Sequence, residues 1–369
     1  MFEKDIEMVS LGFDTVETNE SSIKDIELKK KINEFYSKAR QDAKGDKCYY
    51  CGCSCTSFCN SHSIPAFCLE NIAINGYVYY SNEFINMPIV DKTKGIKKAG
   101  TFHIICRDCD SKIFQDYEDP KNFDSKPTEK MLAQIAMKNY LHSISKRLVE
   151  ISLYDNIKKQ FNMADNYYQN QQLVHDSDLI EYKNGFQRAK KVNEKNWDNE
   201  YYLFYYEKLM YTVPLAFQDD ISIITDLNGK VINDIYNMAP DSHTKDIHVC
   251  IFPMKNYSVI MMFVDSKHSS TYRGFYKQFN KLESTDKLSV INYLVFCYSE
   301  NIFLHKGIDE SVLTNKKLIE ASRKSTLVAA TIGEEKNAIN AASESFDLSK
   351  RTEVPNLLLE EYKINKTKD

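Results

Sequence analysis

Two pairs of cysteines, each with the spacing C-x-x-C, constrain the fold of this chain more than any other feature of its sequence. The first pair is Cys48 and Cys51, the second is Cys106 and Cys109, and residues 52–105 lie between them. Two thiolates on one tight turn can bind the same tetrahedral ion. If both turns bind one zinc ion, the chain segments next to the two pairs must lie side by side.

Other thiols near the first pair leave a second arrangement open. Cys53, Cys55 and Cys59 follow the first pair closely. A local site that combines the first pair with Cys59 and His62 is therefore the rival of the four-cysteine site. Burial as small apolar side chains suits the isolated cysteines elsewhere in the chain and explains such a dense cluster poorly.

Charge and apolar patterning limit the class of protein. The chain has 48 Lys and Arg against 52 Asp and Glu, so any surface that attracts nucleic acid must be local. The N-terminus lacks a basic segment followed by an apolar run, and no stretch is long enough to span a bilayer. We therefore expect a cytoplasmic protein with no membrane contact. Thiols stay reduced there, so that clustered cysteines bind metal rather than form disulfides.

The order of the patterns predicts an α+β fold in which a small zinc-stapled module is followed by a helical hairpin and an α+β domain with antiparallel strands. The short elements around the cysteines predict a thin core that needs a metal ion for stability. The expected domains are an acidic segment with a helix over residues 1–46, the zinc module over 47–125, the helical hairpin over 126–210, the α+β domain over 211–325 and a polar tail over 326–369.

Apolar spacing predicts the helices. Ser22 is a candidate N-cap for a helix to about Ala43. Met131, Ile135 and other apolar residues at helical spacing predict a helix from about Thr128 to Phe161. A second helix is expected from about 179 to 208, and further helices near 271–283, 285–299 and 311–323.

Two hairpins are expected after residue 211. The first has Asn228-Gly229 between two apolar runs, which is a strong signal for a tight turn. The second covers the sequence IHVCIFPMKNYSVIMMFVD at 247–265. Both predict antiparallel strands in the α+β domain.

The segments beside the two cysteine pairs carry groups suited to acid-base chemistry. His62 precedes Pro65, which suits the first turn of a short helix. Asp110 directly follows the second pair and shares a helix face with Glu118. A basic loop lies between the pairs and contains Lys92, Lys94, Lys97 and Lys98. Closure of the four cysteines on one ion would bring the imidazole and the carboxylate together beside this loop.

This pattern resembles the zinc-knuckle form of the HNH, or ββα-metal, endonucleases. The resemblance covers residues 47–120 and rests on a C-x-x-C, the sequence HSIP from His62, and a C-x-x-C that leads into a helix. It also resembles bacterial proteins, some associated with anti-phage defence, in which SHSIP is followed by a helix that begins with C-x-x-C-D or C-x-x-H-D and ends in Phe and Glu. The resemblance implies that His62 is the general base and that Asp110 binds a catalytic Mg²⁺ or Mn²⁺.

One residue departs from the family pattern. The residue before the catalytic histidine is usually an acidic or histidine metal ligand, and here it is Ser61, whose hydroxyl is a poor ligand for Mg²⁺. Either another side chain, such as Asp108 or Glu118, completes the site, or the nuclease is weak or inactive. Zinc binding and structural hydrogen bonding remain alternatives for His62, and stabilisation of a helix N-terminus remains one for Asp110.

The sequence therefore predicts a zinc-stabilised endonuclease that hydrolyses phosphodiester bonds in DNA, with the lysine loop holding the phosphate backbone. DNA is favoured over RNA by the resemblance alone. The region after residue 130 carries no known catalytic motif, and we expect it to regulate the module or to mediate assembly with itself or with a defence partner. One alternative is a non-catalytic zinc protein that binds nucleic acid or a protein partner, and another is a structural subunit whose zinc site only stabilises its fold. The alternative for the lysine loop is a solvated surface.

Overall fold

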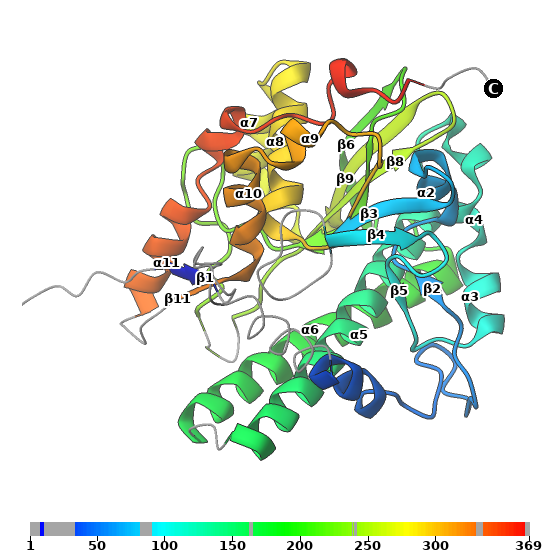
Figure 1. Ribbon diagram of the computed structural model, residues 1–369, viewed down its shortest axis with the longest axis vertical. Coiled ribbons are helices and arrows are strands. Elements are labelled where there is room, and N and C mark those ends of the chain that lie inside the picture. The colour runs from blue at the N-terminus through cyan, green and yellow to red at the C-terminus, as the bar shows by residue number, and fades with distance from the viewer. Residues whose placement is uncertain are drawn as a thin grey trace, which may run out of the picture.

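An antiparallel sheet organises the structure. The computed structural model describes residues 8–10, 34–81, 91–161, 165–237, 239, 242–329 and 335–365 of the chain. Within these residues the main sheet has seven strands, all paired antiparallel (Figure 1). Their order is β4 (Asp91–Gly95), β3 (Tyr77–Ser81), β10 (Ile302–Leu304), β7 (Leu215–Ile221), β8 (Ile247–Pro253), β9 (Ser258–Asp265) and β6 (Tyr201–Leu209).

The central strands are buried on both faces. All eight residues of β9 are buried, and successive side chains of a strand point to opposite faces. Ile260, Met262 and Val264 pack into the core on one face, whereas Met261 and Phe263 pack into the core on the other face. A strand with two covered faces reads as a continuous apolar run, which is why VIMMFV occurs in the sequence.

Helices cover both faces of the sheet (Figure 1). One layer contains α7 (Arg273–Asn280), α8 (Ser284–Tyr298), α9 (Glu310–Leu313) and α10 (Lys316–Ser322). The other contains the hairpin of α5 (Glu129–Phe161) and α6 (Asp165–Lys195). The predicted α+β class, the helical hairpin and the β8–β9 hairpin are confirmed.

Several local predictions were wrong. The second helix of the hairpin begins at Asp165 and not near 179, and the helix expected near 311–323 is divided into α9 and α10. The second helix of the hairpin ends at Lys195 and not near 208, because Asn196 and Asn199 adopt positive φ angles and the following YYLFYYEKL is rich in strand-forming aromatic residues. The Asn228-Gly229 turn forms, but its flanks make a single bridge between Thr225 and Val231 rather than two strands. Of the predicted N-terminal helix, residues 34–42 are helical and residues 22–33 lie outside the described residues.

The cysteine-rich segment forms short elements that meet the main sheet. These are β2 (Ser61–His62), α2 (Ala66–Ile72), β5 (Thr101–Phe102), α3 (Arg107–Ile113) and α4 (Gln115–Glu118). β2 pairs with β5 in a separate two-stranded sheet, whereas β3 and β4 from the same segment extend the main sheet through β10. The module and the larger α+β region therefore share one sheet.

The C-terminal segment also contributes to the main core. Beyond α11 (Glu335–Ser345), the buried Leu348, Val354 and Leu357 pack into the core on the α8 side of the sheet. A two-stranded sheet joins β1 (Met8–Ser10) to β11 (Leu327–Ala329). None of the helices in the described ranges combines the length and the apolar character required to cross a bilayer.

Candidate metal centre and histidine site

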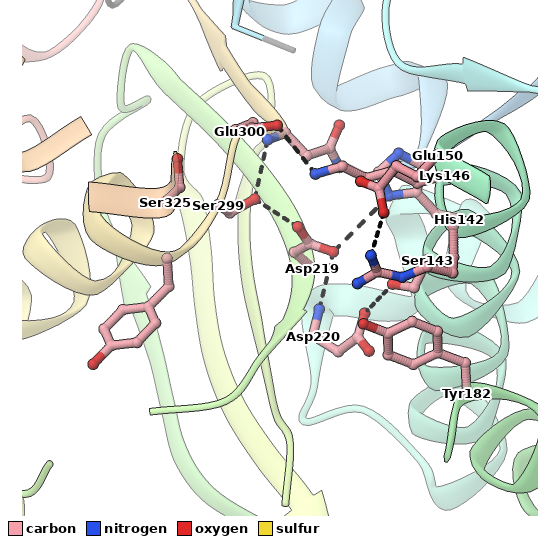
Figure 2. A pocket seen from close by; sticks show the side chains of 13 residues that line it. His142, Ser143, Lys146, Glu150, Tyr182, Asp219, Asp220, Ser299, Glu300 and Ser325 are labelled. Carbon is pink, nitrogen blue, oxygen red and sulfur yellow. Dashed lines mark hydrogen bonds and ion pairs between the residues drawn. The ribbon is translucent and has the colours of Figure 1, made fainter. Parts of the chain in front are cut away.

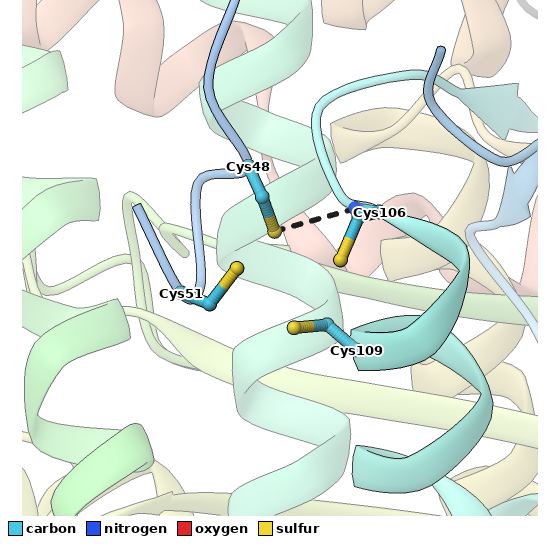
Figure 3. Close-up of side chains that lie close together, drawn as sticks. All are labelled: Cys48, Cys51, Cys106 and Cys109. Carbon is cyan, nitrogen blue, oxygen red and sulfur yellow. Dashed lines mark hydrogen bonds between the residues drawn. The ribbon is translucent and has the colours of Figure 1, made fainter. Parts of the chain in front are cut away.

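The four predicted cysteines converge on one point (Figure 3). The Sγ atoms of Cys48, Cys51, Cys106 and Cys109 all lie within 4.8 Å of one another. Cys48 is 1% exposed, and its Sγ accepts a hydrogen bond of 3.3 Å from the backbone N–H of Cys106. The predicted four-cysteine cluster is confirmed, and its geometry is consistent with a structural zinc ion.

Backbone contacts hold the two cysteine turns together. The Gly52 N–H donates to the Cys48 carbonyl at 2.8 Å, and Gly52 has a φ of +71°, which a residue without a Cβ adopts readily. The Tyr49 N–H donates to the Ile104 carbonyl at 2.8 Å and so joins the first turn to the chain before the second. Cys106 then caps α3, which begins at Arg107.

The chemistry of the thiols fits a cation better than an empty cluster. Burial, followed by hydrogen bonding and repulsion among the neighbouring sulfurs, raises the pKa of the Cys109 thiol, and burial also raises the pKa of Cys106. Four thiols this close cannot ionise together without a compensating charge. A zinc ion would supply that charge and would couple metal binding to folding.

The rival local zinc site is not assembled in the structure. Cys59 donates its S–H to the Ile105 carbonyl at 3.4 Å, and Cys55 donates to the Cys53 carbonyl at 3.4 Å. The His62 ring makes its hydrogen bond to a backbone carbonyl instead. Cys106 and Cys109, rather than Cys59 and His62, surround Cys48.

His62 lies on β2, where its register partner on β5 is Thr101. Its Nε2 lies 2.8 Å from the carbonyl oxygen of Ile96. A carbonyl only accepts hydrogen bonds, so Nε2 carries the proton and Nδ1 is the unprotonated nitrogen of the neutral ring. The half-buried imidazole is therefore oriented with its basic nitrogen away from this carbonyl.

The lysine loop flanks the carbonyl that orients His62. Lys97 and Lys98 follow Ile96 directly in the turn between β4 and β5, and both side chains are exposed. Lys94 is half-buried with its Nζ 5.0 Å from the centre of the Tyr80 ring. Lys92 lies on β4. Two of the four predicted lysines are therefore exposed in the turn whose Ile96 carbonyl contacts His62.

Gly100 fixes this turn against the main sheet. Its φ is +61°, and a Cβ at this position would lie 2.3 Å from Cζ of Phe303 and 2.7 Å from Oγ of Ser63. Its carbonyl accepts a hydrogen bond of 2.8 Å from the Ser63 N–H. The absence of a side chain at Gly100 thus allows the turn, β2 and β10 to approach one another.

We expect Gly100→Ala to destabilise the protein by about 2–4 kcal/mol, because it combines a left-handed backbone with a collision in the core. Gly76→Ala is the matched control, since Gly76 has a φ of +76° with nothing within 4 Å of its Cβ position. This control should lose about 1 kcal/mol from the backbone effect alone. Urea unfolding of both variants measures the difference, and equal losses would show that the contact with Phe303 is unimportant.

Asp110 lies on α3 and is hydrogen-bonded to the strand that carries His62. The buried Ser61 hydroxyl donates to Oδ1 of Asp110 at 2.6 Å. The same oxygen accepts from Nζ of Lys138 at 3.0 Å. Burial opposes ionisation of Asp110, but Lys138 and the Ser61 hydroxyl together lower the pKa of this carboxyl below its usual value. Asp110 is thus a charged partner of Lys138.

Lys138 fills the space between the two acidic residues that were candidate metal ligands. Its side chain is 1% exposed, and its Nζ lies 3.1 Å from Oε1 of Glu118 and 3.7 Å from the centre of the Phe114 ring. Asp110 and Glu118 were predicted to share one helix face, but they lie on separate helices, α3 and α4, and both contact the ammonium group of Lys138. Asp108 is exposed and makes no part of this cluster. A catalytic Mg²⁺ or Mn²⁺ on Asp110 does not fit these contacts.

Sequence reasoning missed Lys138 because it belongs to a helix outside the cysteine segment. A signal was present in the four-residue spacing of one row of polar side chains along the helix. These residues are Gln134, Lys138, His142, Lys146 and Glu150. The first two contact the cysteine module: Gln134 donates to Oδ2 of Asp116 at 2.6 Å and also accepts from the Tyr117 N–H.

Three residues of the same polar row, His142, Lys146 and Glu150, line a cavity of about 160 Å³. The cavity lies between α5, β7 and the segment that leads into β10 (Figure 2). Its lining includes Asp219, Asp220 and Glu300 together with Lys146 and Arg147. Lys146 is paired with Glu300 at 3.1 Å. Burial, with repulsion from Asp246 and Asp219, raises the pKa of Asp220 well above its usual value. Such a polar cavity has room for a few water molecules or a small polar ligand.

Hydrogen bonds connect this cavity to the strand of His62. Ser299 donates to Asp219 at 2.5 Å and accepts from the Asn301 N–H at 3.0 Å. Ser63, next to His62, donates to Oδ1 of Asn301 at 3.0 Å. The buried polar network therefore runs from the cavity to the end of β2.

Comparison with protein-family models, with curated proteins and with solved structures finds no match to this chain.

Proposed function

We propose that this protein is a zinc-stapled, HNH-like endonuclease that hydrolyses phosphodiester bonds in DNA. The observation that carries the proposal is the orientation of His62. Its Nε2–H is bound to the Ile96 carbonyl, so the neutral ring presents Nδ1 as a base beside two exposed lysines. A role in anti-phage defence belongs to the same proposal and rests on the sequence resemblance.

The proposed step is attack of water on a phosphodiester. Nδ1 of His62 takes a proton from the water molecule while the water oxygen bonds to phosphorus. The bond between phosphorus and the 3′-oxygen breaks, and the departing oxygen takes a proton from solvent. A neutral imidazole is available for this role at about pH 7. Lys97 and Lys98 would neutralise charge on the phosphate without reading the bases.

Zinc has a structural role in this proposal. The four cysteines Cys48, Cys51, Cys106 and Cys109 would hold it in a closed site with no position for water, so the ion does no chemistry itself. It ties the turn before β2 to the start of α3. His62 then keeps its position relative to the lysine turn.

A non-catalytic protein that binds nucleic acid through the same surface is the second candidate. It is favoured by one observation, the capture of the Asp110 carboxylate by Lys138, which removes the expected ligand of a catalytic cation. Both candidates predict one bound zinc per chain. Cleavage of DNA separates them, and zinc content does not.

The test is cleavage of supercoiled and linear DNA by the zinc-loaded wild type, first without added divalent cations and then with Mg²⁺ or Mn²⁺. Cleavage supports the endonuclease. Binding of DNA that weakens steeply with salt, without cleavage, supports the second candidate. Neither cleavage nor binding would overturn both.

The lysine turn gives a separate prediction. Lys97→Glu combined with Lys98→Glu should weaken DNA binding by about tenfold or more and make the binding less sensitive to salt, because two phosphate contacts are lost. The unfolding free energy should stay within about 0.5 kcal/mol of the wild type, since both side chains are exposed. Fluorescence anisotropy with labelled DNA measures the binding. An unchanged affinity would mean that the turn is merely a solvated surface.

A further inference from the structure

The ammonium group of Lys138 is coordinated as a metal ion would be. It has three N–H donors, and three oxygens surround it: Oδ1 of Asp110 at 3.0 Å, Oγ of Ser61 at 3.1 Å and Oε1 of Glu118 at 3.1 Å. The face of the Phe114 ring lies on a further side at 3.7 Å. Each donor therefore has an oxygen partner, and the aromatic face adds a favourable cation–π contact.

The electrostatics explain why a cation occupies this position. The Lys138 side chain is 1% exposed, whereas those of Asp110 and Glu118 are 24% and 34% exposed. A buried ammonium group needs charged partners, and the two carboxylates supply them. The oxygens that a hard divalent cation would prefer are thus already bound to the Lys138 ammonium group.

The helix that carries Lys138 holds it in register. Four residues earlier, Gln134 bonds to both Asp116 and the Tyr117 backbone, and next to the module Lys190 of α6 donates to the Tyr50 carbonyl at 2.7 Å. These contacts fix α5 and α6 against the module on either side of the ammonium group. The ammonium group itself is held by its three oxygen contacts to β2, α3 and α4.

We propose that Lys138 is the resident cation of the Ser61–Asp110–Glu118 site and keeps divalent metal ions out of it. A divalent ion at Asp110 would compete for the same oxygens and would be repelled by the ammonium charge. Removal of the ammonium group should turn the three oxygens into a metal site, with water completing the shell. The consequence for catalysis, that the reaction proceeds without a divalent ion on Asp110, rests on the proposed endonuclease function.

Titration of zinc-loaded protein with Mn²⁺, followed by the electron paramagnetic resonance signal of free Mn²⁺, tests the proposal. Wild type and Asp110→Asn should bind Mn²⁺ equally weakly, because Lys138 blocks the site in both. Lys138→Ala should bind one Mn²⁺ at least about tenfold more tightly than the wild type, and the double variant Lys138→Ala with Asp110→Asn should lose this gain. Zinc content is measured in every sample.

Two results would overturn the proposal. One is a Mn²⁺ ion bound by the wild type and lost in Asp110→Asn, a comparison that stays valid even if Lys138→Ala fails to fold. The other is folded Lys138→Ala whose Mn²⁺ affinity equals that of the wild type. Absence of DNA cleavage would instead count against the endonuclease function, and it would leave the metal-binding result standing.

Discussion

His62→Ala is expected to reduce DNA cleavage by about 10²–10⁴-fold, the usual contribution of a general base. The variant removes the one imidazole whose Nε2 is fixed by the Ile96 carbonyl and leaves the four cysteines untouched. Zinc content and thermal unfolding should therefore stay close to the wild type. Plasmid nicking at matched zinc loading measures the effect.

The matched control is His103→Ala. His103 is exposed on the same module, and its Nε2 lies 2.8 Å from the side-chain oxygen Oδ1 of Asn60 rather than from the Ile96 carbonyl. Its removal should leave cleavage within about twofold of the wild type, as expected for a surface histidine. Equal cleavage by both variants would show that His62 is not the base, and loss of zinc from His62→Ala would make it a metal ligand.

Cys106→Ser should reduce zinc from about one ion per chain to almost none. If the free zinc concentration is about 1,000 times the Kd of the site, loss of zinc binding lowers the unfolding free energy by about 4 kcal/mol. For a chain of 369 residues, with an unfolding entropy of about 2.1 cal/mol/K per residue, the Tm should fall by about 5 °C. Atomic absorption and calorimetry measure the two effects. The remaining core is large, so the protein should still fold.

Cys59→Ser is the control for this variant. The Cys59 thiol donates to the Ile105 carbonyl and a serine hydroxyl can replace that bond, so zinc content should not change. Retention of zinc in Cys106→Ser together with its loss in Cys59→Ser would overturn the four-cysteine site and favour the local one.

The cysteine site could be predicted from the sequence because its geometry is local. Each C-x-x-C turn is specified by four consecutive residues, so only the pairing of the turns was in question. The helix from Glu129 was equally accessible, since its apolar residues repeat at helical spacing over 33 residues. Local patterns of this kind do not depend on what the rest of the chain does.

The surroundings of Asp110 could not be predicted, because they depend on distant parts of the chain. Lys138 lies 28 residues from Asp110 and 77 residues from Ser61. A lysine side chain on a helix is ordinarily solvated, so the sequence alone gives no reason to expect that Lys138 is buried. Its burial became visible when the fold packed α5 against α4 and β7.

The same holds for the sheet itself. Tyr80 of β3 is the register partner of Phe303 on β10, and no feature of either short segment specifies the other. Strand pairing over such a separation is decided by the whole core. Likewise, the segment YYLFYYEKL has apolar residues at both helical and strand spacing. It forms strand β6 because it pairs with β9 at the edge of the sheet.

The sharing of one sheet between the cysteine module and the rest of the chain bears on how such a protein can evolve. A gene fragment for residues 47–125 would carry all four cysteines and His62, but it would lack Lys138, and β3 would lose its partner β10. A recombination event that moved only this fragment to another gene would leave Asp110 without its ammonium partner and β3 without β10. Its lineage should therefore be inherited whole, with the helix, the sheet and the cysteines changing together.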